Sequence, residues 1–257
     1  TKGAMTIDGK QWGVPYTYYQ WGVYYRKDIY DELGLSEPST WDAFKANCQA
    51  ILESGRKCYA IGTKFLWTAG GWFDYLNMRT NGFDFHMALA RGEVQWTDDR
   101  VRQTFANWRE LIDMGAYVDN HQNYSWQEAL PFMVNGEAAA YLMGNFAVAP
   151  LREAGLTDDQ LDFYQFPIIT EGLPQGEDAP TDTFHVASGA QNVEAARAFL
   201  QYVEQVRHCT SATRNQRLAA IRALAALMPK MQVVAGCPYN CDPAGEKPML
   251  CESCRAS

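Results

Sequence analysis

Short apolar segments alternate with capped amphipathic segments along most of this chain of 257 residues. Residues 138–143 are apolar throughout, which predicts a buried central strand. Further short strands are expected at residues 21–25, 59–62, 162–167 and 184–188, and Asp8-Gly9 predicts a hairpin turn between residues 5–7 and 11–15. Strands that alternate with helices favour an α/β sandwich with a largely parallel sheet.

Several helices are marked by their capping residues. Gly34 is expected to close a helix over residues 26–33, and Ser39 or Thr40 to open a helix that ends at Gly55. Further helices are expected after the cap Thr97-Asp98-Asp99, at 126–135 after Ser125, before Gly155, and at 193–206. The helix after residue 99 is expected to bury one face, made of Val101, Phe105, Trp108, Leu111 and Ile112.

The chain changes composition near residue 206. Residues 1–206 carry a formal charge of −12, whereas residues 207–257 carry +4. All eight Trp and all twelve Phe precede Arg207, and five of the seven Cys follow residue 206. We therefore expect an acidic, aromatic body over residues 1–206 and a basic, cysteine-rich tail of different origin over residues 207–257.

The composition also excludes some classes of protein. The sequence has no apolar run of about eighteen residues, so no membrane-spanning helix is expected. An acidic body argues against nucleic acid as a partner, because phosphate binding needs a cationic surface. The first residues lack the apolar segment of a signal peptide, so we expect a processed chain or a fragment.

Residues 62–82 hold the strongest candidate binding feature. Trp67 and Trp72 surround the small residues 68–71, which predict a turn, and an amphipathic run with Asp74 follows. An aromatic ring can stack on the C–H face of a sugar while carboxylate and amide groups bind its hydroxyls. The pattern favours a carbohydrate site, with core packing of the two Trp rings as the competing interpretation.

Longer segments carry a family resemblance. GKQWGVPYTYYQWGVYYRKDIYDELGL at 9–35 is similar to a hinge-crossing segment, and PSTWDAF at 38–44 to the helix start that follows it. NGEAAAYLMGNF at 135–146 is similar to the pattern G-x-A-A-M-x-x-x-G-[NDS]-[WF], and TDTFHVASGAQNVEAARAFLQYV at 181–203 to a return crossing with its helix. In this order the segments resemble the extracellular solute-binding proteins of sugar ABC importers, over about residues 4–206.

The resemblance implies a periplasmic-binding-protein-like fold of two lobes that close on a sugar by hinge bending. This chain would hold the second lobe and two crossing segments, with most of the first lobe outside it. The resemblance also implies a non-catalytic, monomeric receptor that lies in the periplasm or is tethered outside the cell and works with a membrane permease.

The resemblance and the local patterns nominate ten ligand-binding residues. They are Tyr19, Gln20, Trp21, Trp67, Trp72, Asp74, Asn145, Phe146, Asp182 and His185. Asn145 and Phe146 follow a buried strand, and ligands of open α/β sheets bind at the carboxyl ends of strands. The competing interpretations are core packing for the aromatic residues, a helix-start carboxylate for Asp74 and a structural role for His185.

Two other functions compete with sugar transport. A glycosidase needs two carboxylates about 5 to 10 Å apart; Asp74 and Asp182 are available, but no catalytic motif supports the pairing, so no enzyme is expected. In the tail, Cys237, Cys241, Cys251 and Cys254 have the spacing C-x3-C and C-x2-C, which could close a zinc site or form disulfides or remain thiols. No other cofactor is expected. The run CPYNCDP in the tail resembles magnesium-chelatase ATPase subunits.

Overall fold

The computed structural model describes residues 5–202, which form two compact units. The larger unit comprises Gln20–Ala179. The smaller unit is described over residues 5–19 and 180–202. The predicted zinc ligands Cys237, Cys241, Cys251 and Cys254, and the end of the predicted helix 193–206, lie outside the described residues.

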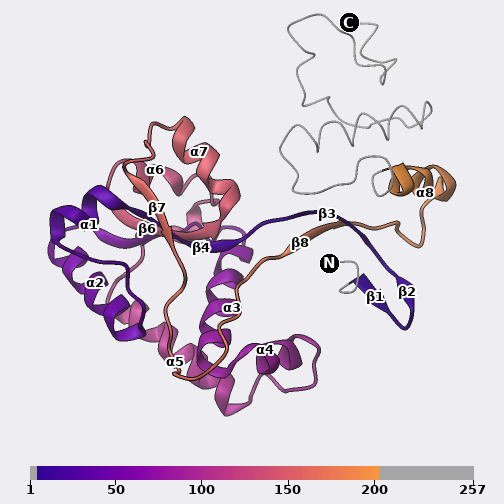
Figure 1. Cartoon of the computed structure of the whole chain (residues 1–257), viewed down its shortest axis with the longest axis horizontal. Helices are drawn as coiled ribbons and strands as arrows, with labels where there is room; N and C mark the ends of the chain where they lie inside the picture. Colours follow the sequence, from indigo (N-terminus) through magenta and orange to yellow (C-terminus); the bar gives the residue numbers. More distant parts are fainter. Residues whose placement is uncertain (1–4, 203–257) are drawn as a thin grey trace, which may run out of the picture. The chain divides into compact units, whose positions relative to one another are not determined.

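The elements of each unit are shown in Figure 1. The larger unit contains β4 (Trp21–Arg26), α1 (Lys27–Leu33), α2 (Trp41–Glu53), β5 (Lys57–Ala60), α3 (Trp67–Asn81), α4 (Phe83–Ala90), α5 (Asp99–Asp113), η2 (His121–Asn123), α6 (Leu130–Val134), β6 (Ala138–Gly144), η3 (Asn145–Ala147), α7 (Val148–Glu153) and β7 (Leu161–Tyr164). The smaller unit contains β1 (Thr6–Ile7), β2 (Lys10–Gln11), β3 (Val14–Tyr18), β8 (Thr181–Phe184) and α8 (Val193–Gln201).

The sheet of the larger unit has the strand order β5-β6-β4-β7. Of the neighbouring pairs only β5–β6 is parallel, because β4 runs opposite to both of its neighbours, β6 and β7. The prediction of a largely parallel sheet is therefore wrong, although the mixed α/β class is confirmed. Alternation of helices and strands does not fix strand direction. Because β4 and β6 are antiparallel, the first residue of β4, Trp21, pairs with the last residue of β6, Gly144.

The core of the larger unit is aromatic on one face of the sheet. Every residue of β6 is buried, as predicted for a central strand. Phe44 of α2 stacks on Tyr59 of β5 at 5.1 Å, and Trp72 of α3 meets the same Tyr59 ring edge-on at 5.1 Å. Since β5 and β6 are covered by helices α2, α3 and α6, the apolar run of β6 is explained by burial on both faces.

The helix ends follow the predicted caps. The Thr40 side chain caps α2 by accepting a hydrogen bond from the Ala43 backbone N–H. The Asp98 side chain caps α5 by accepting one from the Arg100 backbone N–H. Ser125 and Glu128 form a reciprocal capping box. The helix after Ser125 is nevertheless shorter than predicted, with its regular part limited to Leu130–Val134.

The buried face of α5 differs from the prediction. Val101 and Leu111 are buried, but Phe105 and Ile112 are about half exposed. Thr104 is buried in their place and donates a hydrogen bond to the Asn77 side chain of α3. The hydrophobic pattern misassigned this face because α3 offers polar partners that make burial of a polar residue favourable.

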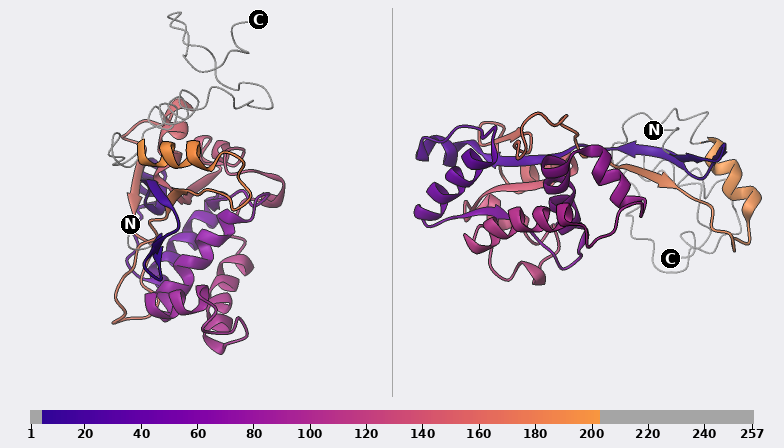
Figure 2. Two further views of the ribbon diagram at one scale, coloured as in Figure 1. Left: turned by 90° about the vertical axis from the view of Figure 1, so that its right-hand side faces the viewer. Right: turned by 90° about the horizontal axis from the view of Figure 1, so that it is seen from below.

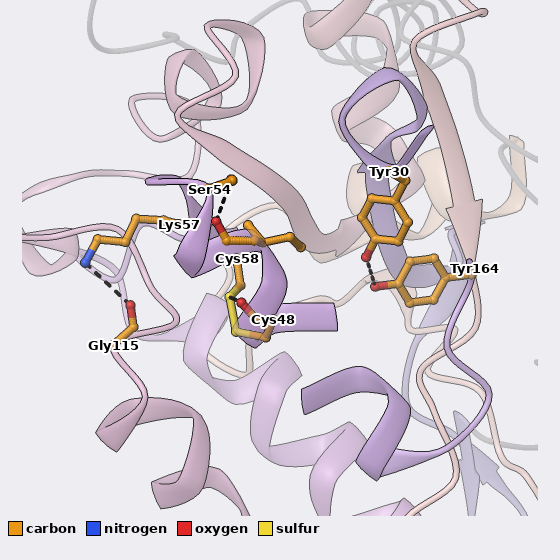
Figure 3. The surroundings of a disulfide bond; sticks show 8 residues. Tyr30, Cys48, Ser54, Lys57, Cys58, Gly115 and Tyr164 are labelled. Carbon is orange, nitrogen blue, oxygen red and sulfur yellow. Dashed lines mark hydrogen bonds between the residues drawn. A yellow bond between two sulfur atoms is a disulfide. The ribbon is translucent and has the colours of Figure 1, made fainter. Parts of the chain in front are cut away.

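A disulfide joins Cys48 in α2 to Cys58 in β5 (Figure 3). Both residues are fully buried, so the bond ties this helix to the sheet inside the core. The sequence analysis did not pair these cysteines. Disulfides persist mainly in oxidising compartments, so this bond fits a protein that works outside the cytoplasm.

The smaller unit contains two short antiparallel pairs. Asp8 and Gly9 both have positive φ, at 51° and 71°, and connect β1 to β2 as the predicted hairpin turn. Strands β3 and β8 pair antiparallel and lie side by side in each view (Figure 2). The second strand spans Thr181–Phe184 instead of the predicted 184–188. None of the helices described within residues 5–202 has the length and apolar character needed to cross a membrane.

Candidate functional site

Residues 68–71 form part of helix α3, so the predicted turn is wrong. Gly71 is required by a contact with the strand β4, because a Cβ atom there would lie 2.4 Å from the Trp21 ring. Gly70 faces open space, with nothing within 4 Å of the position of a Cβ. Gly71 therefore allows close packing of α3 on Trp21, whereas Gly70 lies on a side of the helix that no neighbouring atom covers.

The two predicted Trp residues of this helix lie in different environments. Trp67 is 43% exposed at the first residue of α3. Trp72 is 0% exposed and contacts Tyr59, Tyr117 and Phe166 in the core. The prediction that Trp72 binds ligand is contradicted by its burial, since no face of its ring is accessible.

Four rings from separate elements form what we call the aromatic face: Trp21, Trp67, Trp126 and Phe146. The Trp67 ring meets Trp21 edge-on at 5.8 Å and lies 6.3 Å from Phe146. The Phe146 ring meets Trp126 at 5.2 Å. Trp21 is 4% exposed and packs against Trp67, so its burial contradicts the prediction that it contacts ligand; its indole N–H has no acceptor among the described residues. Trp67, Phe146 and Trp126 keep part of their surface accessible.

Two predicted amide residues lie together near Phe146. The Asn145 backbone N–H donates to the Gln20 carbonyl oxygen at 2.9 Å, which joins the end of β6 to the residue before β4. Both side chains are exposed. The structure therefore brings Gln20, Asn145, Phe146 and Trp67 into one region.

Asp74 lies on α3 seven residues after Trp67, which is two helical turns further along the same side. Its carboxylate is half-buried, and burial raises the pKa of Asp74 to about 6. The nearest basic group is His86 of α4, with Nε2 3.7 Å from Asp74 Oδ1. Burial lowers the pKa of His86, which favours the neutral form of the imidazole beside Asp74.

The segment 176–178 was not among the predicted site residues. The Arg79 guanidinium of α3 donates to the Gly176 carbonyl oxygen and pairs with Glu177 at 2.6 Å. Asp178 follows, and its pKa is raised to about 6 by burial and by the charges of Asp74 and Glu177. The adjacent acidic residues Glu177 and Asp178, just before the return crossing, were the signal available in the sequence. Their partners lie far away in the chain, so the sequence does not show what they contact.

The remaining predicted residues belong to the smaller unit. The Tyr19 hydroxyl donates to Asp182 Oδ1 at 3.4 Å, so these two predicted residues lie together. His185 is bound on both ring nitrogens, to Thr183 at 2.6 Å and to the Trp12 carbonyl oxygen at 2.9 Å. A carbonyl only accepts, so Nδ1 carries the proton and Nε2 accepts from Thr183. The structure gives His185 a structural role instead of the predicted ligand contact.

The larger unit thus presents exposed rings beside exposed amides and a half-buried carboxylate. Such a surface can stack on an apolar ring face and exchange hydrogen bonds with hydroxyl groups. Within residues 5–202 no group of three or more His, Cys, Asp or Glu side chains could hold a metal ion. Of the two carboxylates considered for glycosidase chemistry, Asp74 belongs to the larger unit and Asp182 to the smaller.

Comparisons with known proteins give a consistent result for the body. The sequence profile of the bacterial extracellular solute-binding proteins matches residues 1–205. An uncharacterised ABC transporter extracellular-binding protein of Pyrococcus horikoshii is 30% identical over 169 residues, covering 64% of this chain and 38% of that protein. The solved structure of the bacterial solute receptor AcbH, described as having an exclusive preference for β-D-galactopyranose, is 31% identical with a TM-score of 0.61.

The AcbH match covers 88% of this chain and 54% of the AcbH chain, so this chain spans about half the length of its relatives or less. A separate, shorter match is to a different kind of protein. A stretch of 36 residues, 14% of this chain, is 61% identical to the magnesium-chelatase 38 kDa subunit of Acidiphilium rubrum and covers 10% of it.

Proposed function

The chain belongs to the bacterial extracellular solute-binding protein family, and on this premise we propose that it binds a carbohydrate as part of the receptor of an ABC importer. Proteins of this family are typically non-catalytic, and the proposal includes no enzymatic step.

The observation that carries the proposal is the aromatic face with its polar border. Trp67 offers an exposed ring at the start of α3, supported by Trp21 and Phe146. A sugar ring stacked on Trp67 would place its equatorial hydroxyls at the rim, where Gln20, Asn145 and Asp74 supply donors and acceptors. This combination suits a neutral ring with several hydroxyls better than a purely apolar ligand.

The transport context comes from the relatives. The Pyrococcus horikoshii protein is named as an ABC transporter extracellular-binding protein. We infer that this chain delivers its sugar to a membrane permease from outside the cytoplasm. The buried Cys48–Cys58 disulfide supports such an oxidising location.

The test is calorimetric titration of the whole chain with a panel of sugars. The panel contains galactose, maltose, chitobiose, xylobiose, mannobiose and raffinose. At least one sugar should bind, and Trp67→Ala should weaken that binding by about 5- to 150-fold, taking the about 1–3 kcal/mol that stacking of a nucleobase on an aromatic ring contributes as the guide.

Trp96→Ala is the matched control, since Trp96 is also exposed, at 60%, but packs against Phe73 away from the aromatic face. Its sugar binding should equal that of the wild type. Equal losses in the two variants, or full binding by Trp67→Ala, would remove the aromatic face as the site.

A further inference from the structure

A chain of polar side chains links helix α3 to helices α4 and α5, which pack against it. Asn77 of α3 and Thr104 of α5 are both 0% exposed. A buried amide or hydroxyl is stable only where it makes hydrogen bonds, and each bond has one donor and one acceptor. The bonds of this chain therefore decide which atoms carry hydrogen, and the chain ends at the half-buried carboxylate of Asp74.

The orientation of each amide follows from the backbone carbonyl oxygen of Arg100. A carbonyl only accepts, so the Asn81 atom that lies 3.0 Å from it is the amide nitrogen Nδ2. The same nitrogen lies 2.8 Å from the Asn77 side chain, which therefore presents its oxygen Oδ1. The Thr104 hydroxyl is a second donor to this oxygen, at 3.1 Å. The nitrogen of the Asn77 amide is thus the atom that faces α4.

This orientation decides the tautomer of His86 on α4. Asn77 Nδ2 lies 3.1 Å from His86 Nδ1. An amide nitrogen only donates, so Nδ1 accepts and the neutral ring carries its proton on Nε2. A second proton on Nδ1 would set two donors against each other, which disfavours the imidazolium. Burial acts in the same direction, since it lowers the pKa of His86.

The Nε2 edge of His86 meets Asp74. Nε2 lies 3.7 Å from Asp74 Oδ1, and the side chains of His86 and Asp74 are 16% and 37% exposed. This distance is longer than a direct hydrogen bond. In a partly desolvated position the positive end of the N–H dipole nevertheless favours an ionised carboxylate. An ionised carboxylate accepts hydrogen bonds and donates none.

The other charges of α3 and of the crossing segment do not stabilise this carboxylate. The Arg79 guanidinium is paired with Glu177 at 2.6 Å. Asp178 has the same sign of charge as Asp74, and the two charges interact. Among the described residues, His86 is the basic side chain at ion-pair distance from Asp74.

The charged groups of α4 and α5 make contacts of their own. The Arg100 guanidinium pairs with Asp98 at 2.8 Å and lies over the Phe85 ring at 4.1 Å. Asp84 is exposed to solvent. The imidazole of His86 is therefore the group of these helices that acts on Asp74 directly.

We propose that Asn77 fixes His86 as the tautomer with its proton on Nε2, and that this N–H keeps Asp74 ionised as a hydrogen-bond acceptor for a ligand. His86 is then a positioning residue, which acts on the ligand through Asp74. A ligand group at Asp74 has to donate, so the hydroxyl of a neutral sugar fits and the carboxylate of a uronic acid does not. This last step rests on the proposed function, whereas the tautomer and its effect on Asp74 require no sugar.

The first experiment is nitrogen-15 NMR of the imidazole nitrogens of the whole chain without ligand. The chain has four histidines, and the signals that disappear in His86→Gln are those of His86. Nε2 should carry the proton and Nδ1 none from about pH 6.5 to about pH 8. A proton on Nδ1 in the wild type would overturn the inference, and this result needs no variant other than the one that assigns the signals.

The second experiment is a pH titration of the Asp74 carboxyl carbon by carbon-13 NMR, with Asp74→Asn to identify its signal. The pKa should be about 6 in the wild type. His86→Phe keeps a ring but offers no N–H, and it should raise the pKa of Asp74 by about one unit, a tenfold change in proton affinity. His86→Gln offers an amide N–H in place of Nε2–H and should keep the pKa near that of the wild type.

His121→Phe is the matched control, because His121 is also half-buried but its Nδ1 lies 2.7 Å from the Thr63 hydroxyl. It should leave the pKa of Asp74 unchanged. The same pKa in His86→Phe and the wild type, or an equal rise in His86→Phe and His86→Gln, would contradict the role of the N–H. Both experiments are done without sugar, so their failure is separate from a failure of the chain to bind one.

Discussion

The aromatic face around Trp67 and the aromatic core around Trp72 use the same residue types on the same helix, yet they are built for different purposes. Trp67 is 43% exposed and has rings on one side only. Trp72 is 0% exposed and has rings on three sides. Exposed amides lie near Trp67, and the half-buried Asp74 carboxylate lies two helical turns further along the same side of α3, whereas the ring contacts of Trp72 are aromatic.

The difference arises from helical geometry. The two Trp residues are five positions apart, and at about 100° per residue their side chains point roughly 140° apart. A turn at residues 68–71 could have aimed both rings at a ligand. A helix cannot, so one ring enters the core and the other stays at the surface. The comparison therefore predicts that damage to the core region is measured as stability and damage to the face as binding.

The largest effect is expected from Trp72→Ala. Removing a fully buried Trp leaves a cavity among Tyr59, Tyr117 and Phe166, and such truncations lower the free energy of unfolding by about 3–5 kcal/mol. Urea unfolding followed by circular dichroism measures it. Trp96→Ala, at an exposed position, should lower it by far less. Similar losses in both variants would break the distinction between core and surface.

The disulfide sharpens the comparison from the core side. Replacing both Cys48 and Cys58 by Ala should lower the free energy of unfolding by about 2–4 kcal/mol, because the cross-link restricts the unfolded chain. Thermal unfolding of the double variant and the wild type gives the value. Sugar binding at 10 °C, where both remain folded, should be equal; a large loss of affinity would mean that the core and the face are coupled.

The adjacent glycines of α3 offer a matched pair. Gly71→Ala drives a Cβ to 2.4 Å from the Trp21 ring and should lower the free energy of unfolding by about 1–3 kcal/mol. Gly70→Ala meets open space and should raise it by about 0.5–1 kcal/mol, since Ala favours a helix over Gly. Chemical unfolding of both variants decides. Effects of the same sign would contradict the packing of Trp21 on α3.

A smaller effect is expected from Asp74→Asn, and it depends on pH. The pKa of Asp74 is raised to about 6 in the folded protein, so its ionised form disfavours folding above pH 6. This penalty fades as pH falls from about 6 to about 4. The variant should therefore unfold at a higher temperature than the wild type at pH 7.5 and at the same temperature at pH 4. An increase of equal size at both pH values would exclude the carboxylate as its cause.

Much of the fold could be predicted because its signals are local. The apolar run of β6, the Thr40 and Asp98 caps and the Asp8-Gly9 turn are set by neighbouring residues, and all were found in the structure. The antiparallel direction of β4 was not predicted, because alternation of helices and strands does not fix the direction of a strand. The predicted turn at 68–71 failed because the reason for Gly71 is Trp21, a residue fifty positions earlier.

The candidate site divides in the same way. Trp67, Asn145 and Phe146 could be nominated as candidates because each stands at the end of a strand or the start of a helix, which the sequence marks. The burial of Trp72 and the two hydrogen bonds of His185 were not visible locally. The pairing of Glu177 with Arg79 spans 98 positions, so no short pattern could reveal it.

The most direct measurement of the central claim is nitrogen-15 NMR of the indole N–H signals during a sugar titration. Each of the eight Trp residues carries one indole N–H, and the variants Trp67→Phe, Trp72→Phe and Trp96→Phe assign the three signals that matter. The bound sugar should shift the Trp67 signal and leave those of Trp72 and Trp96 in place. A shift at Trp96 with no change at Trp67 would contradict the account.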